Sequence, residues 1–482
     1  MKTGDVPGGR HSRRAVLSAG GAAAAWLLAA RAAAAAPSAP AAGPTAATST
    51  VPLSFEPLNS GLWTPQGSKL VMGALWEALA PWRASHRSVN LQMLPFGGDT
   101  AVTDLVTGTA PDVILAWQNF GQLVSQGLLL DVNPYLKLSN RSLDVWPSYA
   151  VDAYQWQGGQ YGFPFYVATT CMVVNEDVLD QIGQPYPSPN ATFAEWAALW
   201  GAATKKGASP RYGGSIKSTV NGIAQAYFRG WGGSIMDPAD PTRCTLDSAA
   251  CIAAGNAVFP LLSEGVCALN YGISDCITGL ETQRYASAVL WNAALAVTSL
   301  DLALAKMPKW NFYPMPVMPN GAFAHTQYDY RAINAATKHA EAAWELLEWL
   351  SFEPAFQRTL MQYGLEPPAL KSLQEEYITT LASVIPPFAH KNLSVITQYI
   401  LHNGAIMEPI FPANEAQVQS LIGTGEQAII DGKYDVTEGL TQLAGQVTAI
   451  EVEGVRSAAA AVAAEHAFPT SGPAVAQMPL GL

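Results

Sequence analysis

The residues with the clearest binding chemistry lie in a turn between a predicted strand and a predicted helix. Residues 113–115 form a short apolar run, and apolar residues then recur at helical intervals from Phe120. The turn between them contains Trp117 and Asn119. Ligands of open α/β sheets bind beyond the carboxyl ends of the strands, so a ring flanked by amides there suits a polar, ring-shaped molecule. Core packing of Trp117 is an equally weighted alternative.

Patterns typical of catalysis are absent from the sequence. It contains no G-x-x-x-x-G-K-[ST], H-E-x-x-H or G-x-S-x-G motif, and its seven His residues show no metal-ligand spacing. We therefore expect no catalytic residue, no metal and no cofactor. A carboxylate pair for glycoside cleavage stays open at this point, because two acids distant in sequence can meet in space.

Four cysteines cluster in the middle of the chain, at positions 244, 251, 267 and 276. In an exported protein this grouping predicts two disulfides with three pairings open. We favour Cys244 with Cys251 and Cys267 with Cys276, because both loops are short. A metal site is the weaker alternative, since no C-x-x-C pattern occurs. Cys171 lies in an apolar run and is expected to be a buried thiol.

Composition indicates a large globular protein rather than a nucleic-acid binder. The chain has 482 residues, of which 49% are hydrophobic and 13% charged, with a formal net charge of −11. Such a length exceeds one hydrophobic core and predicts two or more domains. The acidic balance argues against nucleic acid and against a basic membrane-binding face.

The N-terminal segment resembles an export signal. Arg13 and Arg14 precede a short Ala-rich apolar run and small residues up to Ala36, so we expect residues 1–36 to be a cleaved twin-arginine signal peptide. A membrane anchor is disfavoured because the run is below the roughly 20 residues that span a bilayer. No Cys follows that would carry a lipid, which predicts a periplasmic or extracellular protein. Residues 37–52 are expected to form a flexible linker, and 467–482 a tail.

The remaining chain alternates between strand and helix patterns. Residues 51–56 and 89–94 are predicted strands, and each is followed by an amphipathic helical pattern, from Ser68 and from Asp99. This alternation favours an α/β fold with mostly parallel sheets covered by helices. Thr192 and Glu195 have the spacing of a capping box at the start of a further helix.

Eight short motifs occur along the chain in a fixed order. They are 111–114 (PDVI), 126–129 (QGLL), 158–164 (GGQYGFP), 172–179 (MVVNEDVL), 189–196 (PNATFAEW), 231–234 (WGGS), 342–347 (AAWELL) and 363–369 (YGLEPPA). Together they resemble the extracellular solute-binding proteins of ABC sugar importers, the family that includes maltose-binding protein (family 1). The similarity covers about residues 51–450.

This resemblance implies a type II periplasmic-binding-protein-like fold with a hinge between two lobes. Residues 53–166 and 325–366 are expected to form lobe 1, and residues 167–324 and 367–466 lobe 2. A carbohydrate would bind in the interlobe cleft, the lobes would close on it, and an importer's transmembrane subunits would receive it from a monomeric protein.

The resemblance also implies cleft residues from both lobes and from the crossings between them. Phe165 and Tyr166 lie at the first crossing, where packing in the hinge is the alternative, and Trp291 has core packing as its alternative. The segment from His325 departs from the family's glycine-rich pattern and supplies bulky polar groups. The expected ligand-binding residues are Trp63, Trp117, Asn119, Phe165, Tyr166, Trp231, Trp291, Asn292, Tyr328, Asp329 and Arg331.

Two other functions remain compatible with the sequence. The same fold could bind a polyamine, a metal chelate or a phosphodiester, and a cleft dominated by carboxylates without facing rings would favour the polyamine. A secreted glycoside hydrolase or lyase is the enzymatic alternative, supported only by export and by the abundance of aromatic residues.

Overall fold

The computed structural model describes most of the chain beyond the predicted linker. The described residues are 50–56, 65–94, 101–116, 119–217, 225–270, 273–291, 307, 309–327, 329–364, 367–401, 405–406 and 411–467. The predicted signal peptide lies outside them, as do nearly all of the linker and the tail. Within the described ranges, no helix is both long and apolar enough to cross a membrane.

The first lobe is built on a five-stranded sheet of order β2-β1-β3-β15-β6. β1 is parallel to β2 and β3, whereas β15 is antiparallel to its neighbours β3 and β6. These strands are β1 (Val51–Phe55), β2 (Val89–Met93), β3 (Val113–Ala116), β6 (Phe163–Pro164) and β15 (Tyr330–Ile333), and a small hairpin pairs β4 (Gln155–Trp156) with β5 (Gly159–Gln160).

Short helices surround this sheet. The predicted strand and helix around Trp117 are confirmed as β3 and α5, and the predicted helices that follow β1 and β2 are confirmed as α2 and α4. The helices of this lobe are α2 (Pro65–Ala78), α3 (Ala80–Ser85), α4 (Ala101–Thr107), α5 (Phe120–Ser125), α6 (Asn133–Ser139), α7 (Ser148–Asp152), α15 (Ala340–Phe352) and α16 (Pro354–Met361), with a 3-10 turn η3 (Leu143–Val145).

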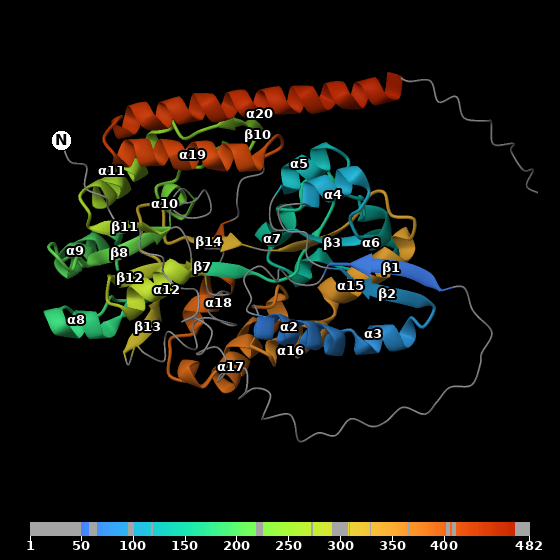
Figure 1. The fold of residues 1–482 in the computed structure, drawn as a ribbon, viewed down its shortest axis with the longest axis horizontal. Helices are drawn as coiled ribbons and strands as arrows, with labels where there is room; N and C mark the ends of the chain where they lie inside the picture. Colours follow the sequence, from blue (N-terminus) through green and yellow to red (C-terminus); the bar gives the residue numbers. More distant parts are fainter. Residues whose placement is uncertain are drawn as a thin grey trace, which may run out of the picture.

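The second lobe is built on a seven-stranded sheet, and it lies beside the first lobe in Figure 1. The strand order is β11-β8-β12-β7-β14-β16, with β13 also paired to β7. Its strands are β7 (Ala168–Asn175), β8 (Tyr212–Lys217), β11 (Cys267–Asn270), β12 (Tyr285–Trp291), β13 (Trp310–Tyr313), β14 (Ala324–Gln327) and β16 (Ala405–Ile406), and β9 (Met236–Asp237) pairs separately with β10 (Asp240–Cys244).

Two long C-terminal helices, α19 (Glu415–Ile430) and α20 (Val436–Ala467), lie along one edge of the second lobe, at the top of Figure 1.

The predicted capping box is confirmed: Thr192 and Glu195 form reciprocal hydrogen bonds at the start of α9. The remaining helices are α8 (Glu176–Ile182), α9 (Phe193–Ala203), α10 (Gln225–Gly230), α11 (Ala249–Ser263), α12 (Ile273–Glu281), α17 (Gln374–Val384) and α18 (Ser394–Leu401), with 3-10 turns η5 (Lys371–Leu373) and η6 (Pro386–Phe388).

The sheets differ from the sequence-based expectation, because they are mixed rather than mostly parallel. Among the strands that lead into and out of the hinge, β6, β7 and β15 run antiparallel to their neighbours, and β14 runs antiparallel to β7 but parallel to β16. The chain passes from β14 of the second sheet to β15 of the first between Gln327 and Tyr330. The predicted limits of the two lobes stay predictions.

Alternating side chains of β7 divide the apolar interior into two cores. Cys171 and Val173 belong to one, and Met172 and Val174 to the other, as expected for a strand buried on both faces. The first, which we call the hinge core, joins both lobes and includes Leu53, Val113, Leu115, Phe163, Phe165, Cys171, Val173, Leu290, Tyr330, Phe356 and Phe388. The second-lobe core includes Met172, Val174, Trp196, Trp200, Ile216, Val258, Val289, Phe411, Ile422, Leu440 and Val447.

One ionisable side chain is buried inside the second lobe without a partner. Glu426, on α19, is 2% exposed, and neither carboxylate oxygen has a hydrogen-bond donor among the described residues. Burial raises the pKa of Glu426 from 4.5 to about 8. Below about pH 4.5 this carboxyl is neutral in the folded and unfolded chain, and at higher pH the unfolded chain ionises first, which favours unfolding.

Replacing Glu426 by Met should therefore flatten the dependence of stability on pH. We expect Glu426→Met to match the wild type near pH 4.5 and to be more stable at pH 8, by on the order of 3 kcal/mol, because a raised pKa destabilises the folded state by about 1.4 kcal/mol per unit. Denaturant unfolding between pH 4.5 and 8.5 measures this difference. Parallel stability profiles for the two proteins would contradict it.

Candidate functional site

The turn after β3 reaches across to the second lobe. Asn119 has a left-handed backbone (φ 62°), a conformation that Asn tolerates better than most residues, and it precedes the first residue of α5. Its backbone N–H donates to Oε2 of Glu415, the first residue of α19, at 2.5 Å. At the other end of α5, Ser125 Oγ donates to the carbonyl oxygen of Pro412 at 2.9 Å. The two lobes are therefore in direct contact at both ends of α5.

The second-lobe side of this contact is held by further hydrogen bonds. Oε1 of Glu415 accepts from Nε2 of Gln419 at 2.7 Å, and Oε2 of Glu451, on α20, accepts from the N–H of Ala413 at 2.9 Å. Glu415 and Glu451 are 5% and 0% exposed. Burial, against the opposing N–H of Asn119 and helped by the Glu451 charge, raises the pKa of Glu415 to about 7, and burial raises the pKa of Glu451 to about 7.

The crossing between the lobes contains four of the predicted site residues. The N–H of Phe165 donates to the carbonyl of Asp329 at 2.8 Å, which ties the outgoing segment to the returning one. Arg331 Nη1 donates to the carbonyl of Glu56 at 2.8 Å, and its guanidinium lies 4.4 Å from the centre of the Phe165 ring. Phe165, Tyr166, Asp329 and Arg331 are all buried, so in the structure these side chains pack inside the crossing.

The buried charges at the crossing have shifted pKa values. Burial raises the pKa of Asp329 to about 7, against the opposing effects of the Tyr166 hydroxyl and the Arg331 guanidinium. Burial likewise lowers the pKa of Arg331 to about 9, although Asp329 and Glu56 favour its charged form. Direct binding of a ligand by Asp329 or Arg331 stays a prediction; the described contacts make both residues supports of the hinge.

The other predicted site residues are placed only in part. Trp231 follows α10 and is half-buried. Its ring packs edge-on against that of Phe193, with the ring centres 5.0 Å apart. Trp291 ends β12, where its backbone pairs with Thr170 of β7. Four predicted residues lie outside the described ones: Trp63, Trp117, Asn292 and Tyr328.

The predicted disulfides are not present. All five cysteines are buried as free thiols. Cys267 belongs to the second-lobe core and Cys276 to the hinge core, so the sheet lies between their side chains. Cys244 and Cys251 share the second-lobe core, but Cys251 Sγ donates to the backbone carbonyl of Ser234 at 3.3 Å.

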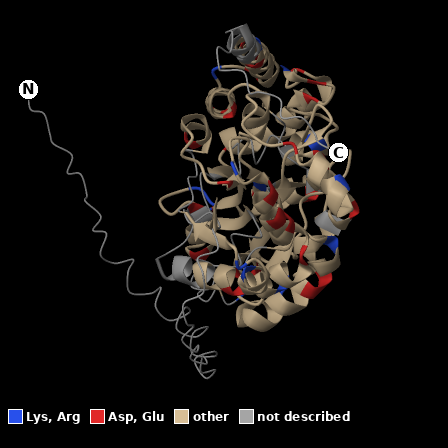
Figure 2. Ribbon diagram, turned by 90° about the vertical axis from the view of Figure 1, so that its right-hand side faces the viewer, with Lys and Arg blue, Asp and Glu red and all other residues tan. Residues whose placement is uncertain are grey.

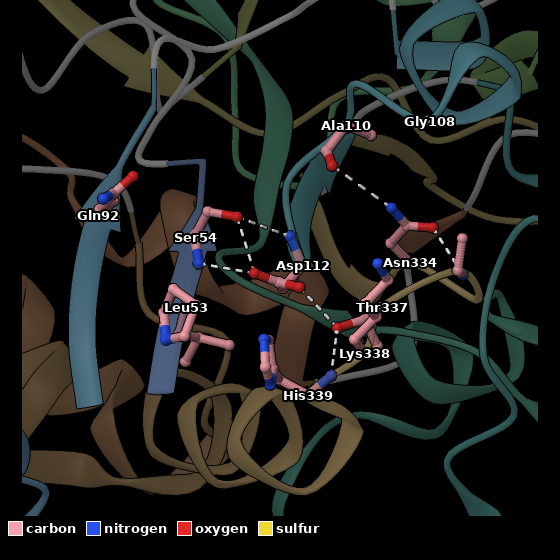
Figure 3. Close-up of a pocket in the computed structure, with 12 residues that line it drawn as sticks. Leu53, Ser54, Gln92, Gly108, Ala110, Asp112, Asn334, Thr337, Lys338 and His339 are labelled. Atoms are coloured by element: carbon pink, nitrogen blue, oxygen red, sulfur yellow. Dashed lines mark hydrogen bonds between the residues drawn. The ribbon is translucent and has the colours of Figure 1, made fainter. Parts of the chain in front are cut away.

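A separate pocket opens at the opposite end of the first sheet. It has a volume of about 280 Å³ and lies beside Asp112, which precedes β3 at the end away from Trp117 (Figure 3). The Asp112 carboxylate accepts from the N–H and Oγ of Ser54 and from Oγ1 of Thr337, so it joins β1 to the turn after β15. Its hydrogen-bonding capacity is used within the lobe, which makes it a structural tie.

Charged side chains of both signs are interspersed on the side of the molecule that Figure 2 shows. In the view of Figure 2, Lys and Arg are scattered singly among Asp and Glu, and the described residues form no continuous basic face there. Among these residues, no group of three His, Cys, Asp or Glu side chains is arranged to hold a metal ion.

Sequence reasoning missed the second-lobe partners of the turn, Glu415 and Pro412. The one local signal is Asn414, whose side chain accepts from the N–H of Gln417 as an N-cap. An N-cap predicts a helix start but not its position against another lobe.

Two lobes joined by crossing segments, with a contact between their facing loops, define the class of two-lobed binding proteins. Residues 72–355 match the family model described as bacterial extracellular solute-binding protein, and the chain belongs to that family. The family resemblance and the two-lobed α/β fold expected from the sequence are thereby confirmed. No match was found among curated proteins.

Solved structures of similar fold include three from different bacteria. An ABC substrate-binding protein, Lmo0181, from Listeria monocytogenes, in complex with cycloalternan, is 16% identical with a TM-score of 0.67, over 83% of this chain and 98% of that one. UgpB from Mycobacterium tuberculosis, in complex with glycerophosphocholine, is 18% identical with a TM-score of 0.65, over 83% and 98%. The sugar-binding protein MalE from Xanthomonas citri is 16% identical with a TM-score of 0.64, over 87% and 100%.

Removing the buried cation of the crossing should destabilise the protein. Arg331→Leu leaves the carbonyl of Glu56 without its buried donor and the buried Asp329 carboxyl without the nearby positive charge, so we expect a loss of about 3–5 kcal/mol in the free energy of unfolding. Arg358→Leu is the matched control, because Arg358 pairs with Glu376 at 2.9 Å with roughly half of each side chain exposed; it should change stability by less than about 1 kcal/mol. Urea unfolding of both variants measures the difference, and equal effects would refute the supporting role.

Proposed function

We propose that the protein captures a carbohydrate, a mono- or oligosaccharide, between its lobes and delivers it to an ABC importer. Family membership supports the class of function, and neighbours of similar fold are described in complex with cycloalternan, acarbose and maltose. The observation that carries the proposal is the contact between Asn119 and Glu415, since it brings a proposed ligand-binding residue of the first lobe against the second lobe.

Closure of two lobes suits a ligand with polar groups and apolar faces. A sugar presents hydroxyls that need hydrogen-bond partners once they leave water, and C–H faces that pack on aromatic rings. A ligand that touches both walls gains its second set of contacts only in the closed form, so it favours closure. Trp117, Tyr166 and Trp291 are the proposed rings, and Asn119, Asp329 and Arg331 the proposed polar groups. Trp63, Phe165, Trp231, Asn292 and Tyr328 complete the proposed site.

A phosphodiester is the second candidate ligand, because one neighbour is described in complex with glycerophosphocholine. The proposed aromatic rings fit either ligand, since rings also pack against choline-type cations. The two candidates differ in charge: a sugar is neutral, whereas a phosphodiester needs donors or cations for its anion.

We also propose export by the twin-arginine route to a periplasmic or extracellular location, and action as a monomer without catalysis. Detection of the precursor in a twin-arginine transport mutant tests the route. Incubation of purified protein with saccharides, followed by chromatography, tests for turnover; any product would favour the hydrolase or lyase alternative.

A thermal-shift panel identifies the ligand class. Mono- and oligosaccharides, a polyamine and glycerophosphocholine would each be added to the purified protein. A ligand at 100 times its Kd should stabilise the folded state by about 2.7 kcal/mol and raise Tm. We expect a saccharide to do so. A shift with glycerophosphocholine alone would replace the carbohydrate proposal by the phosphodiester one.

Truncation of the proposed ring at the end of β12 should weaken binding without unfolding the protein. For Trp291→Ala we expect a loss of about 2 kcal/mol, roughly thirtyfold in Kd, because aromatic side chains dominate such contacts. Trp156→Ala, on the β4–β5 hairpin, is the control and should leave Kd unchanged. Calorimetric titration with the saccharide found in the panel measures both, and equal affinity of Trp291→Ala and wild type would remove Trp291 from the site.

A further inference from the structure

Glu415 occupies an unusual position, because its burial depends on both lobes. It belongs to α19 of the second lobe, yet Oε2 accepts from the N–H of Asn119 in the first lobe at 2.5 Å, and only 5% of the residue is exposed. Phe411 and Val418, on either side of it, belong to the second-lobe core. Phe120, next to Asn119, belongs to the hinge core. Separation of the lobes would therefore expose this carboxyl to water.

The groups that face Glu415 do not compensate its charge. From α20, the Glu451 carboxylate repels it, and from its own helix Gln419 donates one neutral hydrogen bond. From β15 of the first lobe, the Tyr330 hydroxyl is close enough for its own ionisation to be opposed by Glu415 and by Glu56. Among the described residues, no Lys, Arg or His forms an ion pair with Glu415.

We propose that closure of the lobes takes up a proton, with Glu415 as the group that binds it when Asn119 covers it. The proposal rests on the lobe motion of the proposed function but not on the class of ligand. Glu415 is then a positioning residue: it fixes the backbone amide of Asn119 in the closed form and makes that form sensitive to pH.

The sign of the effect follows from solvation. In the closed form burial raises the pKa of Glu415 to about 7, whereas a carboxyl returned to water has an ordinary value near 4.5. Between these two values, the closed form binds more protons than the open one, so acid favours closure. Lowering the pH from 8 to 5.5 should raise the ratio of closed to open protein by roughly thirtyfold.

The distance between the lobes can be measured without any ligand. Spin labels would be attached at Leu138→Cys on α6, where Leu138 is 86% exposed, and at Lys433→Cys between α19 and α20. The native thiols are all buried, and the unsubstituted protein controls for their labelling. Double electron–electron resonance at pH 5.5 and 8.0 should show a larger short-distance population at pH 5.5. Identical distributions at the two pH values would overturn the proposal.

Three variants assign the effect to Glu415. Glu415→Gln has no charge to bury and should show the acid-like population at both pH values. Glu426→Gln, on the same helix but inside the second lobe, should keep the wild-type dependence. Ser125→Ala removes a neutral bond to Pro412 and should lower the closed population equally at both pH values. A wild-type pH dependence in Glu415→Gln would refute the assignment.

If Glu415→Gln does not fold, a variant of the neighbouring carboxyl tests the same proposal. Glu451→Gln removes the neighbouring charge and should move the midpoint of the wild-type pH dependence to lower pH, and an unchanged midpoint would count against the proposal. Calorimetry gives an independent readout once the panel supplies a ligand. Binding measured at pH 6.5 in buffers of different ionisation enthalpy should show net proton uptake in wild type and none in Glu415→Gln. Failure to find a sugar ligand would affect the proposed function alone, because the distance experiment uses no ligand.

Discussion

The pairing of two crossing segments is the constraint on which the arrangement of the lobes depends. β6 and β15 lie side by side in the first sheet and continue into β7 and out of β14 of the second. The hydrogen bond from Phe165 to Asp329 fixes their register, and Arg331 ties them to the end of β1 through Glu56. A charge as deeply buried as Arg331 is tolerated because an acidic neighbour, an aromatic face and a carbonyl surround it. The crossing is therefore a hydrogen-bonded polar cluster enclosed by apolar side chains.

The interface in front of the crossing has a different character. There the first lobe donates the backbone amide of Asn119 to the Glu415 carboxylate and the hydroxyl of Ser125 to the carbonyl of Pro412. The Glu451 carboxylate accepts from Ala413 within the second lobe. The hydrogen bond from Asn119 offsets part of the desolvation of the buried Glu415 carboxyl.

Sequence patterns were sufficient for local structure and for the family, and insufficient for tertiary placement. The run before Trp117 and the Thr192–Glu195 pair predicted β3, α5 and the start of α9, because strand, turn and cap signals act over a few residues. The sheets are mixed because the strands beside the hinge run antiparallel to their neighbours. No local sequence pattern indicates the direction in which a strand pairs. Asp329 and Arg331 were predicted from their position at the return crossing, but their burial was not predicted, since burial depends on packing partners distant in sequence. The disulfides predicted from the cysteine spacing are absent, and for one expected pair the reason is that Cys267 and Cys276 lie on opposite faces of a sheet.

Strand order in the first lobe has a consequence for how the protein is made. β15, which lies between β3 and β6, is encoded near residue 330, after almost the whole of the second sheet. A ribosome must therefore extend the chain well past its midpoint before β15 can be inserted between β3 and β6, and until then the edges that β15 will cover stay unpaired. The sheet of the N-terminal lobe is thus completed only after most of the second lobe has been synthesised.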